Sequence, residues 1–190
     1  MTKLIEKPQP SFPEAVRKGC NRLFDFHGRT RRSDFWWFML AYMVCYFILT
    51  NIWKAFLPLL AGAICDLAVL SLALAITVRR LQDRGASKWW VFTNYASTVV
   101  YTLYIYGTGI GEELMSVNAS PEASMGMLTD PIFIISLIFI ISLIVVMITG
   151  LVTFVLCLLD GKPQPNKYGS SPKYIIKEET TNEQHLEATA

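Results

Sequence analysis

The sequence predicts an all-α, polytopic membrane protein with four transmembrane helices, and three observations support this prediction. Of the 190 residues, 53% are hydrophobic, and the mean hydropathy is +0.38, which exceeds what a soluble domain of this size usually has. Four apolar stretches come close to, or exceed, the roughly 20 residues that a helix needs to cross a bilayer. Lysine and arginine are concentrated beside alternate ends of these stretches, as topology determinants are.

A single membrane domain is predicted over residues 11–174, between two polar ends. Residues 1–10 are predicted to be a flexible N-terminus. The start of the chain has neither the apolar core nor the cleavage site of a signal peptide, so we expect it to be retained. Residues 175–190 are polar, and we expect a disordered tail.

A short amphipathic helix is predicted over about residues 12–25. Ser11 and Glu14 have capping-box spacing, and Pro13 suits a first helical turn. The apolar positions at helical spacing are Val16, Cys20, Leu23 and Phe24. We expect this helix to lie in the membrane interface. A helix that packs on a soluble partner remains the alternative, because an amphipathic stripe does not identify what it faces.

The predicted spans cover about residues 35–53, 59–78, 89–106 and 131–157. The third is the most polar, and the fourth is so long that it must tilt or project from the bilayer. Between the second and third spans, residues 78–90 (VRRLQDRGASKWW) are predicted to be a basic, turn-like linker.

The distribution of basic residues predicts that both termini lie in the cytoplasm. Of the 17 lysines and arginines, only Lys54 lies in the first or third connection. The others beside the spans are Arg29, Arg31, Arg32, Arg79, Arg80, Arg84, Lys88, Lys162, Lys167, Lys173 and Lys177. Aromatic residues agree with this orientation, since Trp36, Trp37, Trp89 and Trp90 are placed to anchor two helices at the cytoplasmic interface.

Three segments, FDFHGRTRRSDFWW, VRRLQDRGASKWW and DGKPQPNKYGSSP, resemble the signatures of a bacterial inner-membrane family catalogued as domain of unknown function 805. The matching positions are Phe26, Gly28, Arg29, Arg32, Asp34, Phe35, Trp36, Arg79, Arg80, Leu81, Asp83, Gly85, Ser87, Trp89, Trp90, Gly161, Asn166, Tyr168, Gly169 and Pro172. One departure is Gln82, which stands where the family usually has histidine and weakens any proposal of proton chemistry there. The resemblance implies a bacterial inner-membrane location and no assigned reaction.

The predicted topology brings the three segments together on the cytoplasmic side. The candidate ligand-binding residues are Arg29, Arg32, Arg79, Arg80, Asp83, Ser87 and Asn166. An interfacial ion-pair network is one interpretation of them. Binding of anionic lipid headgroups or another anionic ligand is the second. A third is a headgroup enzyme with Asp83 as its base, but no nucleophile-base pair supports catalysis, so the chain is not expected to be an enzyme.

Asp66 is an intramembrane carboxylate in the outer half of the second span, and such residues are candidates for function. Lys54, across the first connection, is positioned to pair with Asp66 structurally. The alternative is a small oligomeric transporter that uses Asp66 and the polar face of the third helix, formed by Asn94, Ser97, Thr98, Tyr101 and Thr102.

The four cysteines and two histidines show no metal-binding or redox spacing, so neither a metal nor a cofactor is expected. A net charge of +2 predicts no nucleic-acid partner. The expected function is binding or assembly in the membrane. Its expected partners are membrane lipids, a membrane protein or a second copy of the chain.

Overall fold

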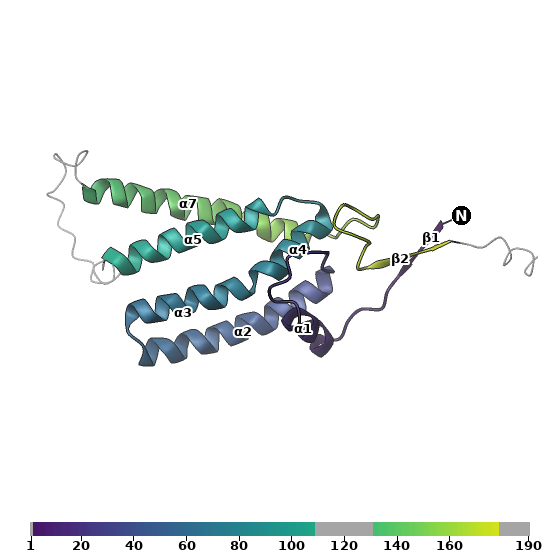
Figure 1. Ribbon diagram of the computed structural model, residues 1–190, viewed down its shortest axis with the longest axis horizontal. Coiled ribbons are helices and arrows are strands. Elements are labelled where there is room, and N and C mark those ends of the chain that lie inside the picture. Colours follow the sequence, from purple (N-terminus) through teal and green to yellow (C-terminus); the bar gives the residue numbers. More distant parts are fainter. Residues whose placement is uncertain (1, 109–130, 179–190) are drawn as a thin grey trace, which may run out of the picture.

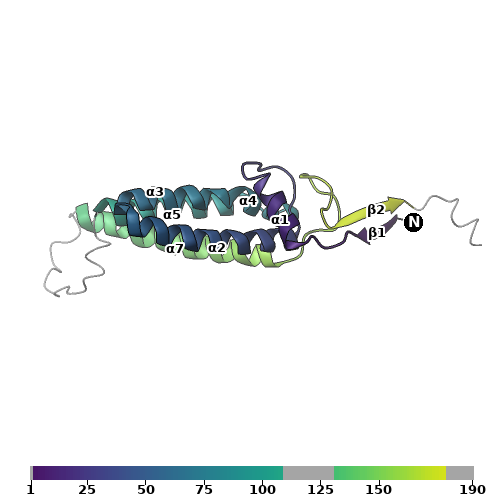
Figure 2. The ribbon, with the colours of Figure 1, turned by 90° about the horizontal axis from the view of Figure 1, so that it is seen from below.

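The computed structural model describes residues 2–108 and 131–178. Its elements, in chain order, are β1 (Thr2–Glu6), α1 (Phe12–Cys20), α2 (Arg32–Phe56), α3 (Leu59–Leu72), α4 (Leu74–Arg84), α5 (Trp89–Thr108), α7 (Pro131–Leu158) and β2 (Tyr174–Glu178). The described chain is therefore mostly helical. The long helices lie side by side in an elongated bundle, and α1 lies across one end of it (Figures 1 and 2).

Three helical segments are long and apolar enough to cross a membrane: Arg32–Trp53, Leu60–Arg84 and Leu137–Leu158. Large apolar side chains cover the outside of the bundle, and Phe47 and Met147 are 70% and 68% exposed. Exposed apolar surface on this scale belongs in contact with lipid. The third predicted span, over residues 89–106, also forms a helix, α5, but it is not among these three segments.

Polar side chains join neighbouring helices within the bundle. The amide of Asn94 on α5 donates hydrogen bonds to Val146 O on α7 at 2.9 Å and to Thr149 Oγ1 at 3.0 Å. The hydroxyl of Tyr95 donates to Leu67 O on α3 at 3.2 Å. Such bonds stabilise helix pairs inside a bilayer, where apolar contact alone discriminates weakly between partners. The polar face predicted on the third helix thus includes residues that join helices.

The second predicted span is interrupted and then continues further than expected. It consists of α3 and α4, which meet at Ala73. Near the break, Ser71 Oγ donates to Ala68 O at 2.6 Å and Thr77 Oγ1 to Ala73 O at 2.7 Å. Bonds of this type compete with the backbone ladder and bend helices.

The linker predicted as turn-like is therefore mostly helix, and that prediction was wrong over residues 78–84. Helix α4 continues to Arg84 and ends at Gly85, which adopts a left-handed conformation (φ 75°). The amide of Ala86 then donates to Leu81 O at 2.9 Å and closes the helix. The chain turns only over residues 85–88 before α5 begins.

The buried apolar core lies at one end of the bundle, which we call the basic end. This end consists of the start of α2, all of α4, the start of α5, the end of α7 and the loop after α7, with α1 lying across it. Its buried members are Phe35, Phe38, Ile76, Val78, Leu81, Val91 and Cys157. Along the rest of the bundle most large apolar side chains remain exposed. The basic end thus has a buried core like that of a soluble protein, whereas the rest of the bundle has most of its large apolar side chains exposed on its outer surface.

Helix α1 packs on α2 through its smallest residues. Ala15 and Gly19 are buried, and a Cβ atom at Gly19 would lie 2.1 Å from Phe38 Cδ2. The helix ends at Cys20, five residues before the predicted end. Cys20 is exposed, and so is Phe24, which follows the helix. Helix α1 approaches α2 closely because its contact residues, Ala15 and Gly19, are small. The predicted apolar face is therefore not the face that meets α2 throughout, and Cys20 and Phe24 remain exposed.

Residues 2–6 and 175–178, which were predicted to be flexible, belong to strands, and the rest of the predicted tail, residues 179–190, lies outside the described residues. Strands β1 and β2 pair antiparallel, with Ile5 opposite Ile175 and Glu6 opposite Tyr174. The guanidinium of Arg31 holds the following segment, donating to Glu6 Oε1 and Lys7 O at 2.9 Å each. These interactions explain why residues 2–6 and 174–178 have regular structure. Both strands lie beyond the basic end (Figure 1), so both described ends of the chain lie on the same side of the bundle.

Candidate functional site

Asp83 on α4 is at the centre of a buried ion-pair cluster. Its Oδ1 accepts a hydrogen bond from Arg29 Nε at 2.7 Å, and its Oδ2 accepts one from Arg80 Nη1 at 2.8 Å. Arg80, Asp83 and Arg29 are only 0%, 3% and 7% exposed. We call these three residues the Arg–Asp cluster. Removing any one of these buried charges leaves its partners without a counter-charge, which lowers the stability of the folded protein.

Backbone carbonyls accept most of the remaining donors of the two arginines. Arg29 donates to Asp83 O, Lys162 O, Gln164 O and Gly169 O, so all five of its N–H groups are engaged. Arg80 donates to Thr30 O, Cys157 O and Leu159 O. The cluster therefore docks the loop that follows α7, and neither guanidinium is left open to an external anion.

The third signature segment, DGKPQPNKYGSSP at residues 160–172, packs directly on the Arg–Asp cluster. The amide of Asn166 donates to Gln82 O at 2.9 Å, and Lys162 N donates to Asp83 O at 3.2 Å. Gly161 is so close that a Cβ atom there would lie 1.7 Å from Asp83 Oδ2. The convergence of the three signature segments is therefore present, and its immediate effect is structural. The side-chain oxygen of Gln82 is buried and has no partner among the described residues.

Arg79 lies apart from the cluster, although it is adjacent in sequence to Arg80. Its Nη1 donates to Arg22 O at 2.8 Å and Asp25 O at 2.7 Å, and the residue is 2% exposed. It thus holds the turn after α1. Within that turn, a hydrogen bond from the His27 amide, together with Arg22, lowers the pKa of Asp25.

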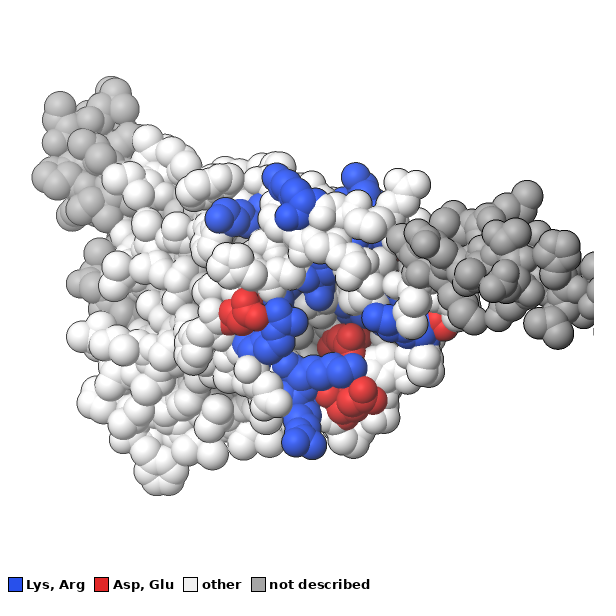
Figure 3. All heavy atoms as spheres, turned by 45° about the vertical axis from the view of Figure 1, so that its right-hand side comes forward, with Lys and Arg blue, Asp and Glu red and all other residues white. Residues whose placement is uncertain are grey.

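Two of the predicted ligand-binding residues lie at the surface. The side chain of Arg32 is 52% exposed, and its Nε lies 3.4 Å from Asp160 Oδ1. Ser87 is exposed, and its Oγ accepts the Trp89 amide at 3.3 Å, at the start of α5. Lysine and arginine side chains gather on the basic end, interspersed with carboxylates, while the adjoining bundle surface is uncharged (Figure 3).

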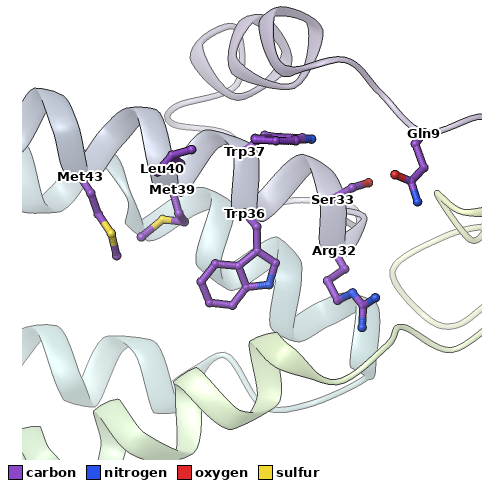
Figure 4. Close-up of a pocket in the computed structure, with 8 residues that line it drawn as sticks. All are labelled: Gln9, Arg32, Ser33, Trp36, Trp37, Met39, Leu40 and Met43. Carbon is purple, nitrogen blue, oxygen red and sulfur yellow. The ribbon is translucent and has the colours of Figure 1, made fainter.

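A groove of about 480 Å³ runs along the first turns of α2 (Figure 4). It is lined by Gln9, Arg32, Ser33, Trp36, Trp37, Met39, Leu40 and Met43. Gln9, Arg32 and Ser33 lie at one end, and the methionines and Leu40 extend along the helix from there. Ser33 Oγ is buried and has no partner among the described residues. Arg32 was among the binding residues predicted from the sequence, whereas Gln9 and Ser33 were not, because no pattern marks a residue that merely lines a groove.

The predicted tryptophan anchors have different environments. Trp89, Trp37 and Trp90 are 68%, 40% and 39% exposed, as interfacial anchors would be. Trp36 is only partly exposed, and its ring meets that of Phe154 on α7 edge to face, with centroids 5.9 Å apart. Trp36 therefore joins α2 to α7 as well as lining the groove.

Asp66 has a partner that the sequence did not indicate. Trp53 Nε1 donates to Asp66 Oδ1 at 3.0 Å across the α2–α3 turn. The side chain of Lys54, the predicted partner, lies outside the described residues. Asp66 borders a cavity of about 270 Å³ together with Thr98, Tyr101 and Thr102 of α5. The predicted polar face and the carboxylate thus share one cavity.

Among residues 2–108 and 131–178, no group of three or more His, Cys, Asp or Glu side chains is placed to hold a metal ion. The buried Cys157 belongs to the core of the basic end.

The mostly helical fold, with three segments long and apolar enough to cross a membrane, is typical of helical membrane proteins. The chain belongs to the family described as "Protein of unknown function (DUF805)", whose model matches residues 23–170. It is similar to the uncharacterized protein YiiR of Escherichia coli K12 and of Escherichia coli O157:H7, with 41% identity over 75 residues in each case. The match covers 37% of this chain and 49% of each relative, so the chain spans about half the length of these curated relatives. No solved structure matches the chain.

Proposed function

We propose that this protein crosses the bacterial inner membrane four times, with its basic end in the cytoplasm, and binds an anionic phospholipid in the groove of α2. One observation supports an even number of crossings, and a second supports the orientation. The described ends of the chain lie beyond the same end of the bundle, which requires an even number of crossings. The basic residues gather at that end, as they do on the cytoplasmic side of membrane proteins. Helix α5 supplies the fourth crossing.

The observation that carries the lipid proposal is the two-part chemistry of the groove. At its polar end, Arg32 offers a half-exposed guanidinium, and Ser33 Oγ is a buried hydroxyl without a described partner. Beyond them the lining is apolar, with Met39 and Leu40 on one turn of α2 and Met43 on the next. A phosphodiester fits the first part and an acyl chain the second.

Charge favours an anionic lipid over a zwitterionic one at this site. Arg32 and Lys173 pair with Asp160 at 3.4 Å and 3.6 Å, and Lys173 and Arg31 pair with Glu6 at 3.7 Å and 2.9 Å. These three cations and two carboxylates leave one positive charge in excess. A basic residue at the membrane surface attracts anionic lipid by roughly 1 kcal/mol. Of the seven predicted ligand-binding residues, Arg32 alone carries the proposal, because Arg29 and Arg80 are buried and held by internal partners.

The proposal can be tested by native mass spectrometry of the protein released from nanodiscs that contain phosphatidylglycerol and phosphatidylcholine. Wild type should retain phosphatidylglycerol, while Arg32→Gln and Ser33→Ala should retain less. Lys88→Gln is the matched control, since Lys88 is exposed near the same end but does not line the groove. Equal retention by wild type and both groove variants would overturn the proposal, and so would a membrane protein or second copy bound there instead of lipid.

Transport is a second candidate, favoured by the cavity that Asp66 shares with Thr98 and Thr102. Four helices offer little room for a path, so an oligomer is required. Asp66→Asn should then abolish cation or proton flux in liposomes while leaving lipid retention intact. Wild-type protein that gives no flux above empty liposomes would exclude this candidate.

A further inference from the structure

A second cavity, separate from the groove, lies under α1 at the basic end. Its volume is about 290 Å³, and residues of α1, of the turn before α2, of the start of α2 and of α4 line it. Charged side chains dominate the lining: Lys18, Arg22, Arg29, Asp34 and Arg79. Arg29 belongs to the Arg–Asp cluster, but neither that cluster nor the lipid groove accounts for the other four charged residues.

Arg79 leaves one edge of its guanidinium unused at this cavity. Both of its described hydrogen bonds leave from Nη1, and its buried Nε has no partner among the described residues. The Nε and Nη2 groups form the planar fork that grips an oxyanion with two parallel hydrogen bonds. The acceptors that Nη1 reaches are both backbone carbonyls, so no carboxylate among the described residues is hydrogen-bonded to Arg79. Arg79 is only 2% exposed, and an oxyanion bound in the cavity would accept the hydrogen bonds that its guanidinium lacks.

Asp34 lines the same cavity and has a carboxylate oxygen that lacks a hydrogen-bond donor among the described residues. Its Oδ1 is buried and lacks a hydrogen-bond partner among the described residues. The nearest cation is Lys18, whose Nζ lies 3.9 Å from Oδ1, and that ammonium is already 2.9 Å from Glu14 Oε1. The cavity thus has an unused donor edge on α4 and an unused carboxylate oxygen on α2. An acceptor and a donor that belong to one small molecule would satisfy both.

We propose that the cavity beneath α1 binds a zwitterion in which a phosphate and an ammonium group are joined by a short linker, the chemistry of ethanolamine phosphate. The Nε and Nη2 edge of Arg79 holds the phosphate, and the nearby Arg22 and Lys18 add positive charge. Asp34 Oδ1 accepts a hydrogen bond from the ammonium group. The source is either a lipid headgroup or a soluble phosphoamine. This site differs from the groove in its lining and in the charge of its ligand, so it does not depend on the proposed function.

The test measures binding of O-phosphoethanolamine, inorganic phosphate and ethanolamine to the full-length protein in detergent by isothermal titration calorimetry. The zwitterion should bind at least about tenfold more tightly than either half alone, since each half leaves one charged group of the cavity unpaired. Asp34→Asn should remove the preference for O-phosphoethanolamine over phosphate. Arg32→Gln, a groove variant, should leave the preference unchanged, which separates failure of this proposal from failure of the lipid proposal.

Arg79 also holds the turn after α1, so Arg79→Gln is expected to disturb the fold, and Arg79→Lys is the useful variant. Lysine can reach the carbonyls but has no planar fork, so O-phosphoethanolamine should bind about tenfold more weakly to a folded protein. Absence of binding to wild type, equal affinity for phosphate alone, or full affinity in Arg79→Lys would each overturn the proposal.

Repeating the titration in nanodiscs identifies the source. If phosphatidylethanolamine abolishes binding of the soluble zwitterion, the site takes a lipid headgroup. If binding is unchanged, the natural ligand is soluble.

Discussion

At the scale of single residues, Asp83 determines how the basic end is held together. Both of its carboxylate oxygens bind buried arginines, one from the turn before α2 and one from α4 itself. Those arginines in turn fix the carbonyls of the loop after α7. Removal of the central charge therefore leaves two buried cations without a counter-charge.

Asp83→Asn should lower the free energy of unfolding by about 3–5 kcal/mol, the usual cost of breaking a buried ion pair. Asp160→Asn is the matched control, because Asp160 also pairs with two cations but is 53% exposed. That control should change stability by about 0–1 kcal/mol. Unfolding in mixed micelles, monitored by circular dichroism over a denaturant series, measures both. Equal losses in the two variants would show that the cluster contributes no more than a surface pair.

Gly161→Ala should also destabilise the basic end, because its added methyl would lie 1.7 Å from Asp83 Oδ2. The loop must then withdraw from the cluster and expose the carbonyls that the arginines bind. Gly62→Ala in α3 is the control, since its nearest described atom would be 3.7 Å away. Removing a helical glycine there should be neutral or gain about 0.5–1 kcal/mol. The same unfolding experiment applies, and a Gly161→Ala protein as stable as wild type would refute the close packing.

At the scale of elements, the helices were largely predictable and their interruptions were not. Long apolar runs predicted helices within a few residues of α2, α5 and α7. The break at Ala73 depends on the hydroxyls of Ser71 and Thr77, whose choice of acceptor cannot be read from an apolar run. The run of charges in α4 was taken for a linker. Its helix is stable because partners distant in sequence take up those charges.

Gly19→Val should release α1 from α2, because the new side chain would occupy the position of the Phe38 ring. Amide hydrogen exchange over residues 12–20 should then accelerate while α5 and α7 remain protected. Cys20→Val is the matched control, since Cys20 is the exposed neighbour on the same helix. If Gly19→Val leaves exchange in α1 unchanged, the close contact between α1 and α2 does not hold the helix in place.

At the scale of the whole molecule, the sequence predicted the meeting of the three signature segments but not their burial. Alternation of basic residues was enough to predict that the segments meet at one end of the bundle. Burial depends on the loop after α7 folding back over Asp83, and on Gly161 permitting that approach. Neither depends on a local pattern. Consequently the predicted binding residues proved to include structural ones, and Gln9 and Ser33 were missed.

The proposed orientation predicts where Cys20 can be labelled. This thiol is exposed at the basic end, whereas Cys157 is buried there. A membrane-impermeant maleimide should label Cys20 in inverted vesicles and leave it unmodified in intact spheroplasts. Cys20→Ser is the control for labelling elsewhere. Labelling of Cys20 in intact spheroplasts would place the basic end outside the cytoplasm and would refute the proposed topology.

The central claim is that the basic residues of this end divide into buried ones that hold the fold and an exposed Arg32 that binds lipid. The most direct measurement follows retained phosphatidylglycerol and the unfolding temperature of Arg32→Gln on the same purified sample. Retention should fall about fivefold, as loss of roughly 1 kcal/mol implies, with the unfolding temperature unchanged. Full retention by Arg32→Gln, or a fall in its unfolding temperature comparable to that of Asp83→Asn, would contradict the claim.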